Sequence, residues 1–347
     1  MKVLFTHELF PPDIRGGGEV TAGGTAFALR DLGVDVRVLS GGDPKIKECR
    51  GIPTHRLWLH RYAMNFAVAA IQEAARNVDL IQTFNYNTCL PALIAGRRAG
   101  IPVFFYALGL FGETWREMKP FPFGRFWEWL EAYQIRQRWD ELFFPSDFAL
   151  KEGVRLGADP EHSHVAPPGL EQHLLHSAVE KEDVVLFTGK FDTRKGVYQV
   201  IEVARALPHV RFRLYGFGPD AAKIRDGVPP NVEVESYVTS ERLPDELGRA
   251  RICIFPSKAE TFGMALAQAM ACGCAIVSSI PLPFEGYHID ALDTAGMVDA
   301  VSRLWSDREL CARMGAANVP IARRYTWDST ARVMLGVYER VLAGRPV

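Results

Sequence analysis

Short apolar runs alternate with longer amphipathic segments along the chain. Such runs are typical of strands buried on both faces of a parallel sheet, and the segments between them have the length and residue types of helices. In the first half, the pattern predicts strands at residues 3–6, 35–40, 79–83, 102–106 and 141–145, and helices at 19–31, 63–76, 90–99 and 125–138.

The alternation begins again after a Pro/Gly break at 165–169, which we interpret as an interdomain linker. Two successive strand–helix alternations predict two Rossmann-like α/β domains, at 1–168 and 169–327. The second half predicts strands at 183–189, 210–215, 232–237, 252–255 and 275–278, and helices at 196–206, 243–249, 264–271, 296–307, 309–323 and 327–342.

Composition narrows the class of protein. The chain has 347 residues, of which 48% are apolar and 23% charged, with a formal net charge of −1. This length suits two domains, and the charge gives no reason to expect a nucleic-acid partner. Because no apolar run is long enough to span a membrane and the apolar start is too short for a signal peptide, we expect a cytoplasmic protein.

The cysteines give no sign of a metal site. Six of them are scattered along the chain without the paired spacing of zinc ligands. We interpret them as reduced residues of the core, and we expect neither a metal nor a cofactor.

The segment 255–278 predicts a strand, a short acidic loop, a helix, a glycine turn and a second strand. The loop places Glu260 at the carboxyl end of a strand, where open α/β sheets bind ligands. Gly263 opens the helix, whose free N–H groups and positive dipole end suit an anion or a polyol.

Two further glycine-rich loops each precede a helix. Gly16, Gly17 and Gly18 follow the first strand and would let the backbone approach a phosphate or an acceptor, although a flexible turn is the alternative. The loop 189–196 begins at Gly189 and carries Lys190 and Lys195, which suits a diphosphate, although a solvated basic turn is the alternative.

These segments resemble the GT-B glycosyltransferases of the family-four retaining group. The shared signature is Pro-Ser, an acid, Phe-Gly, a second acid eight positions after the first, and Ala-Met-Ala-x-Gly. The resemblance implies two Rossmann-like domains whose parallel sheets face each other across a cleft. It also implies an N-terminal acceptor domain, a C-terminal donor domain and a last helix, 328–347, that crosses back to the first domain.

The resemblance also implies the reaction, a retaining, hexosyltransferase-like transfer from a UDP- or GDP-linked sugar to an acceptor hydroxyl in carbohydrate biosynthesis. Glu260 would orient the donor sugar, while Lys190 and Lys195 would stabilise the departing diphosphate. Gly16, Gly17 and Gly18 would form the acceptor or phosphate loop. The remaining donor-binding residues that it implies are Gly189, Gly216, Gly218, Thr261, Phe262, Gly263 and Gln268.

The chain departs from the family pattern at several positions. Gln268 replaces the second acid, and a neutral amide binds a diol more weakly than a carboxylate does. Leu108 replaces a histidine that contacts the donor sugar in relatives, with His7 the nearest substitute by topology and a partly buried structural role its alternative. The segment 279–288 lacks a glycine pair and carries Glu285 as the candidate acid, and Tyr237 falls in the segment near the nucleobase.

These departures keep a second class of function open, a catalytically degenerate homologue that acts as a binding or partner subunit. A GT-B epimerase or phosphorylase fits less well, because segment 255–278 follows the transferase pattern.

The acceptor remains open among a saccharide, a lipid-linked compound and a small molecule. Residues 121–130 are rich in aromatic side chains, and the following helix carries Arg125, Arg136 and Arg138, which suits peripheral contact with the cytoplasmic membrane face. Acidic residues are interleaved with them, and this favours the alternative in which the aromatic side chains simply pack on the sheet. The acidic residues are Glu128, Glu131, Asp140 and Glu141.

Overall fold

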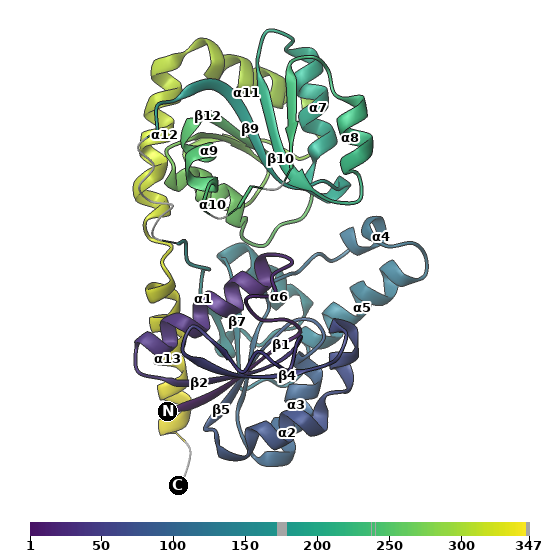
Figure 1. Ribbon diagram of the computed structural model, residues 1–347, viewed down its shortest axis with the longest axis vertical. Coiled ribbons are helices and arrows are strands. Elements are labelled where there is room, and N and C mark those ends of the chain that lie inside the picture. Colours follow the sequence, from purple (N-terminus) through teal and green to yellow (C-terminus); the bar gives the residue numbers. More distant parts are fainter. Residues whose placement is uncertain (172–178, 237, 240, 345–347) are drawn as a thin grey trace. The chain divides into compact units, whose positions relative to one another are not determined.

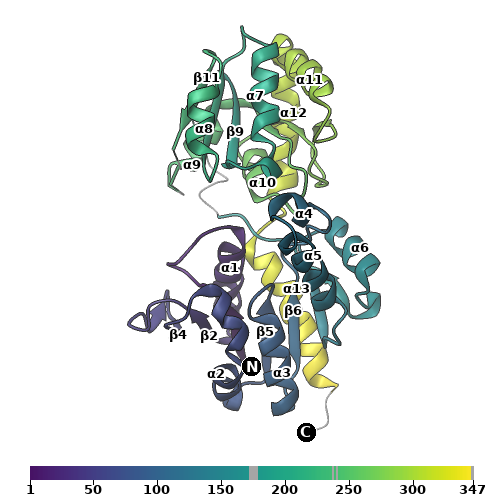
Figure 2. The same cartoon turned by 90° about the vertical axis from the view of Figure 1, so that its right-hand side faces the viewer.

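The computed structural model describes residues 1–171, 179–236, 238–239 and 241–344, which form two compact units (Figures 1 and 2). Unit 1 comprises Met1–Trp115, Phe121–Gly169 and Trp327–Val347, and unit 2 comprises Arg116–Pro120 and Leu170–Thr326. These bounds differ by one residue from the divisions expected at 168/169 and 327/328. The grouping of Arg116–Pro120 with unit 2 was not foreseen.

Within its described residues, unit 1 contains an eight-stranded sheet in the order β3-β4-β2-β1-β5-β6-β7-β8. Neighbouring strands pair in parallel, except for β3 and β4. Large rings such as Phe5, Phe84 and Phe104 are fully buried on the sheet. The strands are β1 Lys2–His7, β2 Asp35–Gly41, β3 Glu48–Cys49, β4 Ile52–Leu57, β5 Leu80–Phe84, β6 Val103–Tyr106, β7 Glu141–Phe144 and β8 Ser163–Val165.

Helices flank this sheet, and one predicted helix is broken. The continuous helix expected at 63–76 is instead a 3₁₀ turn, a short α-helix and a second 3₁₀ turn. The Asn65 side chain donates to the carbonyl of Tyr62 at 3.0 Å, and such bonds compete with the helical ladder. The helices are α1 Gly17–Asp31, η1 Arg61–Phe66, α2 Val68–Ala74, η2 Ala75–Asn77, α3 Cys89–Ala99, α4 Thr114–Met118, α5 Phe123–Ile135, α6 Asp147–Leu156 and η3 Pro160–His162.

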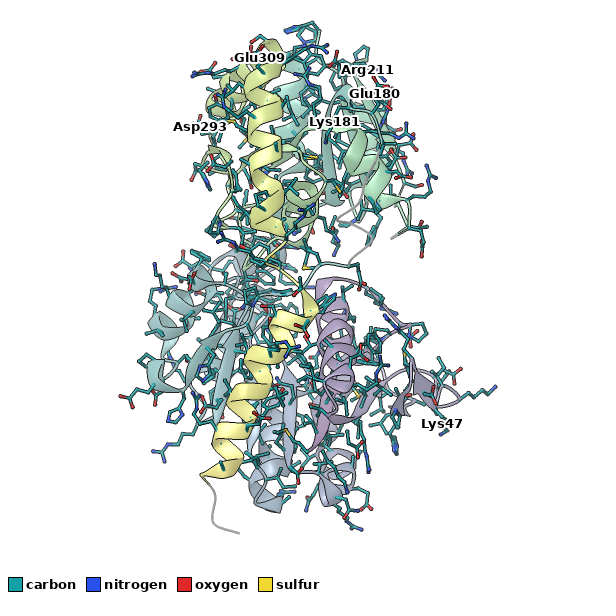
Figure 3. The ribbon with its side chains drawn as sticks, turned by 90° about the vertical axis from the view of Figure 1, so that its left-hand side faces the viewer. Lys47, Glu180, Lys181, Arg211, Asp293 and Glu309 are labelled. Atoms are coloured by element: carbon teal, nitrogen blue, oxygen red, sulfur yellow. The ribbon has the colours of Figure 1, made fainter. Side chains whose placement is uncertain are left out.

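The last helix, α13 (Trp327–Ala343), belongs to unit 1, which confirms the predicted return of the chain to its first domain. It lies beside α1 (Figure 3). Tyr338 is fully buried, and its hydroxyl donates to Oε1 of Gln82 on β5 at 2.7 Å. Gly24 of α1 makes room for the Trp327 ring, because a Cβ at Gly24 would lie 2.4 Å from it.

Unit 2 contains, among its described residues, a parallel six-stranded sheet in the order β11-β10-β9-β12-β13-β14. The strands are β9 Glu182–Lys190, β10 Phe212–Phe217, β11 Val232–Glu235, β12 Ala250–Phe255, β13 Ala275–Ser278 and β14 Gly286–His288. The helices are η5 Thr193–Lys195, α7 Val197–Ala206, α8 Ala221–Gly227, α9 Leu243–Arg249, α10 Met264–Ala271, α11 Thr294–Ser306 and α12 Arg308–Ala322.

Two details of unit 2 differ from the sequence prediction. The strand expected at 232–237 ends at Glu235, and Tyr237 lies outside the described residues. Part of the segment 279–288, expected as a turn, forms the edge strand β14 and pairs in parallel with β13.

Candidate active site

Glu260 and Lys195 meet at the carboxyl edge of the unit 2 sheet. They lie on the loops that follow β12 and β9, which are neighbouring parallel strands. Nζ of Lys195 is 2.5 Å from Oε2 of Glu260, and Nη1 of Arg194 is 3.4 Å from the same oxygen. Arg194 is not among the residues predicted from the sequence, so the structure adds it to the site.

The two loops are also joined through their backbones. The N–H of Lys258 donates to the carbonyl of Arg194 at 2.8 Å, and Nη1 of Arg194 donates to the carbonyl of Ala259 at 3.2 Å. Gly196 adopts a φ of +74°, and a Cβ there would lie 2.0 Å from the carbonyl oxygen of Pro256. Only glycine allows this approach, so the loop sequence itself brings Lys195 to Glu260.

Electrostatics hold Glu260 in its charged form. Burial would raise the pKa of Glu260, but the charges of Lys195 and Arg194 outweigh burial and hold that pKa below its ordinary value. The Glu260 side chain is 16% exposed, and that of Lys195 is 21% exposed. A carboxylate and two cations therefore share a mostly buried site that solvent still reaches.

The other residues predicted at this edge differ in exposure and in what explains their position. Lys190 is exposed at the end of β9, beside Phe217 of β10. A Cβ at Gly216 would lie 2.2 Å from the carbonyl oxygen of Gly189, and one at Gly218 would lie 2.5 Å from that of Phe191. Close packing of the two strand ends therefore requires these glycines, and no ligand is needed to explain them.

Around the start of α10, the predicted donor-binding residues divide into buried and accessible ones. Thr261 and Phe262 are buried, and the Phe262 ring packs edge-on against Tyr325 at 5.1 Å between centroids. Phe262 is thus a core side chain, and a donor contact there would come from its backbone. Gly263, with a φ of +90°, begins α10, and Gln268 is half-buried on that helix.

The segment before β14 is fixed by side-chain hydrogen bonds. The Ser278 hydroxyl donates to the carbonyl of Phe255 at 2.9 Å and accepts from the N–H of Ile280 at 3.0 Å. The N–H of Glu285 donates to Oδ1 of Asn318 at 2.8 Å, and Glu285 is exposed. The backbone N–H of Glu285 is therefore bound to α12.

In unit 1, the predicted phosphate loop lies beside the carboxyl of Glu19. Gly16 is the N-cap of α1, whose first residues are Gly17 and Gly18. Burial raises the pKa of the Glu19 carboxyl, while its hydrogen bonds from backbone groups, including those of Arg15 and Gly16, act in the opposite direction. A Cβ at Gly16 would lie 3.7 Å from Oε2 of Glu19, so a phosphate bound at this loop would meet that carboxyl.

His7 lies beside the same loop. A Cβ at Gly18 would lie 3.5 Å from Nε2 of His7 and 4.0 Å from Leu108. Leu108 therefore lies near His7, its nearest substitute by topology. His7 is 2% exposed, and Nδ1 lies 2.6 Å from the carbonyl oxygen of Leu9, to which we assign its proton. Burial lowers the pKa of His7 to about 4, so the ring is neutral.

A pocket of about 590 Å³ lies in unit 1. Its walls come from the carboxyl ends of the parallel strands β1, β2 and β4. The Trp58 side chain is 80% exposed on this wall. Sequence reasoning missed this pocket. The lining residues are Leu9, Pro12, Asp13, Ile14, Arg15, Gly42, Asp43, Trp58, Leu59, His60 and Arg61.

Buried polar contacts support the pocket. Nη1 of Arg56, which is 2% exposed, donates to the carbonyl of Phe10 at 3.0 Å and to Oδ2 of Asp13 at 2.9 Å. Arg61 forms an ion pair with the buried Glu8. The wall therefore offers one aromatic surface together with cationic and anionic side chains.

The described residues contain no candidate metal centre and no helix suited to cross a membrane. No group of three His, Cys, Asp or Glu side chains among them could hold a metal ion. None of the helices in the described ranges is long and apolar enough to cross a membrane.

Comparison with known proteins agrees with the geometry. The domain described as "Glycosyl transferase 4-like domain" matches residues 16–169, and the one described as "Glycosyl transferases group 1" matches residues 182–307. D-inositol 3-phosphate glycosyltransferase of Xylanimonas cellulosilytica is 28% identical over 56% of this chain and only about half, 55%, of its own length. Alpha-maltose-1-phosphate synthase of Mycolicibacterium smegmatis is 24% identical over 99% of this chain and all of its own.

Solved structures share the fold at low sequence identity. Sucrose-phosphate synthase of Thermosynechococcus elongatus matches with a TM-score of 0.85 and 17% identity, over 99% of this chain and 100% of that one. Anabaena HepE in complex with UDP matches with a TM-score of 0.80 and 17% identity, over 98% and 100%. The chain is thus a divergent GT-B-fold protein that belongs to the group 1 glycosyl transferases, with a glycosyl transferase 4-like domain followed by a group 1 domain.

Proposed function

We propose that this chain transfers a sugar from a nucleoside-diphosphate sugar to an acceptor hydroxyl, with retention of the anomeric configuration. The observation that carries this proposal is the contact of Glu260 with Lys195 and Arg194 at the carboxyl edge of the unit 2 sheet. A carboxylate beside two cations suits a ligand that presents sugar hydroxyls and a diphosphate together.

The ion pair suggests how a donor would bind. Without a donor, Glu260 is the anionic partner of Lys195 and Arg194. A diphosphate carries more negative charge than one carboxylate, so it would attract both cations and leave Glu260 to accept hydrogen bonds from sugar hydroxyls. The three side chains carry a net charge of +1 without the donor, which favours the entry of an anion.

The same cations would act during the reaction. When the bond between the sugar C1 and the diphosphate oxygen breaks, its electron pair stays on the diphosphate, where Lys195 and Arg194 stabilise the added charge. The acceptor oxygen forms the new bond to C1 on the same face of the ring. Its proton passes to the departing phosphate oxygen, so no protein base is required and the loss of a histidine at Leu108 is tolerated.

We propose UDP as the nucleotide, with GDP as the second choice. HepE structures are described with UDP and with UDP-glucose, which supports this order. We further propose that the acceptor is a sugar or polyol that enters the unit 1 pocket. An exposed indole offers a flat apolar surface for a sugar ring, while Asp43 and Arg15 offer hydrogen-bonding groups for its hydroxyls. A cytoplasmic location stays a prediction from the sequence.

A donor panel tests the proposal. Purified protein is incubated with UDP-, GDP- and ADP-linked sugars, with and without candidate sugar acceptors, and release of the nucleoside diphosphate is measured. We expect release from a UDP-linked sugar that increases when the acceptor is added. Absence of both turnover and calorimetric binding of UDP, GDP and ADP would instead support the degenerate binding subunit, which Gln268 and Leu108 keep as the second candidate.

A further inference from the structure

The α5 region of unit 1 presents large aromatic side chains to solvent. Phe121 is 80% exposed, Phe123 59%, Phe126 50%, Trp129 58% and Tyr133 43%. Single exposed aromatic residues are common, but contiguous exposed apolar patches usually mark a surface that contacts something else.

Four of these residues form a continuous stripe. Phe123, Phe126, Trp129 and Tyr133 recur at the spacing that places residues on one side of a helix. The Trp129 ring stacks on Tyr133 at 5.2 Å between centroids, and Phe126 lies 6.1 Å from Trp129. The aromatic face of α5, as we call Phe121 and this stripe, therefore forms one surface.

The opposite side of α5 packs into the unit. Gly124, Glu131, Gln134 and Ile135 are its buried residues. In Figure 1, α5 lies at the outer edge of its unit. The stripe thus points away from the core of unit 1, and the core leaves it uncovered.

The exposed charged residues of the segment 121–138 are all arginines. Arg125, Arg136 and Arg138 are exposed, and the guanidinium of Arg125 lies 5.9 Å from the centroid of the Phe121 ring. Aromatic side chains with flanking arginines are typical of segments that lie in the interface of an anionic membrane.

Three of the four acidic residues that argue from sequence against membrane contact are bound within the unit, whereas Glu128 is half-buried beside the stripe. Glu131 is 2% exposed and accepts hydrogen bonds from the N–H of Gly112 at 2.8 Å and from Nε1 of Trp115 at 2.9 Å. Glu141 is 4% exposed and contacts His164 at 2.6 Å, while Asp140 accepts from the N–H of Val103 at 2.8 Å. Most of the alternation of charges in the sequence is therefore lost on the surface.

We infer that the aromatic face of α5 docks unit 1 on an anionic lipid surface. The rings would enter the boundary between headgroups and acyl chains, and the arginines would meet lipid phosphates. A symmetric contact with a second copy would bring the same arginines close to one another, which like charges disfavour. An anionic surface carries the complementary charge.

Vesicle sedimentation tests this inference on the full-length protein. We expect binding to vesicles of phosphatidylcholine with 30 mol% phosphatidylglycerol and little binding to phosphatidylcholine alone. Arg125→Gln and Arg138→Gln should each lower the vesicle partition coefficient about fivefold. The double variant Phe126→Ser/Trp129→Ser should abolish binding, and Leu292→Ser, which alters an exposed leucine of unit 2, should not.

The control measurements separate the outcomes. Circular dichroism and thermal melting confirm that each variant is folded. Binding of Phe126→Ser/Trp129→Ser at the wild-type level would overturn the inference. The inference would also be overturned if the wild-type protein bound no vesicles and formed a dimer in sedimentation equilibrium that dissociated in this variant. The assay contains no nucleotide or acceptor, so its result is independent of the proposed reaction, which nucleoside diphosphate release measures separately.

Discussion

The ammonium of Lys195 lies 2.5 Å from a carboxylate oxygen of Glu260 and joins the loops that follow β9 and β12. Each side chain is the other's counter-ion in the absence of a ligand. A diphosphate would therefore compete with Glu260 for the cation, and the two residues should respond differently to substitution.

We predict opposite effects of the two substitutions on nucleotide affinity. Lys195→Ala should lower turnover about 100-fold or more, because a group that stabilises the departing charge is lost, and it should weaken UDP binding. Glu260→Gln should also lower turnover but leave UDP binding unchanged or tighter, since the competing anion is gone. Turnover assays and calorimetry measure both quantities.

Lys223→Ala, which removes an exposed cation on α8, is the matched control and should behave like the wild type. Equal losses of UDP affinity in Glu260→Gln and Lys195→Ala would show that the pair is only structural. Retained turnover in both would remove the site assignment.

A second prediction concerns the unit 1 pocket. Trp58→Ala should raise the acceptor KM about tenfold, a loss of roughly 1.4 kcal/mol of acceptor binding. It should not change UDP affinity or donor hydrolysis without acceptor, because Trp58 belongs to a different unit from Glu260. Steady-state kinetics at varied acceptor concentration measure the effect.

Phe66→Ala is the control for this experiment, since Phe66 is 86% exposed and does not line the pocket. An unchanged acceptor KM in Trp58→Ala would exclude the pocket as the acceptor site.

His7 should make the protein less stable in mild acid. Its pKa is about 4 in the folded protein, against an ordinary value of 6.5, because burial disfavours the charged ring. The unfolded chain therefore binds the proton first, and stability is lost as pH falls from about 6.5 towards 4. Between pH 7 and pH 5 this group alone should lower the free energy of unfolding by about 2 kcal/mol.

Urea denaturation at the two pH values measures this effect. His7→Gln should reduce the pH dependence by that amount, whereas His209→Gln, which alters an exposed histidine, should preserve it. If both variants kept the wild-type dependence, the buried neutral ring would not be its source.

The contact between α1 and α13 allows a prediction on stability. Gly24→Ala should lower the free energy of unfolding by about 1–3 kcal/mol, because its methyl group would overlap the Trp327 ring. Gly336→Ala on α13 should instead raise it by about 0.5–1 kcal/mol, since a Cβ there meets open space and alanine favours the helix. Denaturant unfolding measures both, and a stabilised Gly24→Ala variant would contradict the packing.

Local sequence was sufficient where apolar segments end at glycine, proline or a charged residue. The predicted bounds of α9, α10 and β13 agree with the structure for this reason. Strand β4 escaped prediction because its inward positions include Thr54 and Arg56, whose polar groups are satisfied by tertiary hydrogen bonds. The pattern of apolar residues cannot show such bonds.

The residues of the candidate site divide in the same way, into those that local sequence predicts and those that depend on tertiary contacts. Loop motifs pointed to Glu260 and Lys195, because glycines and charges at strand ends are visible in sequence. Arg194 and the pocket beside Trp58 depend on how separate loops meet, and so sequence alone did not reveal them. The aromatic segment 121–130 was visible in the sequence, but not which of its rings face solvent, since Phe126 is exposed while the adjacent Trp127 is half-buried.

The return of α13 to unit 1 has a consequence for protein synthesis. Met334, Val337 and Tyr338 complete the core around α1 and the first strands, yet they are translated after the whole of unit 2. Unit 1 therefore leaves the ribosome with an apolar groove unfilled, and its final packing waits until the last helix has emerged. The nascent chain must keep that groove from aggregating for as long as the ribosome needs to make the second unit.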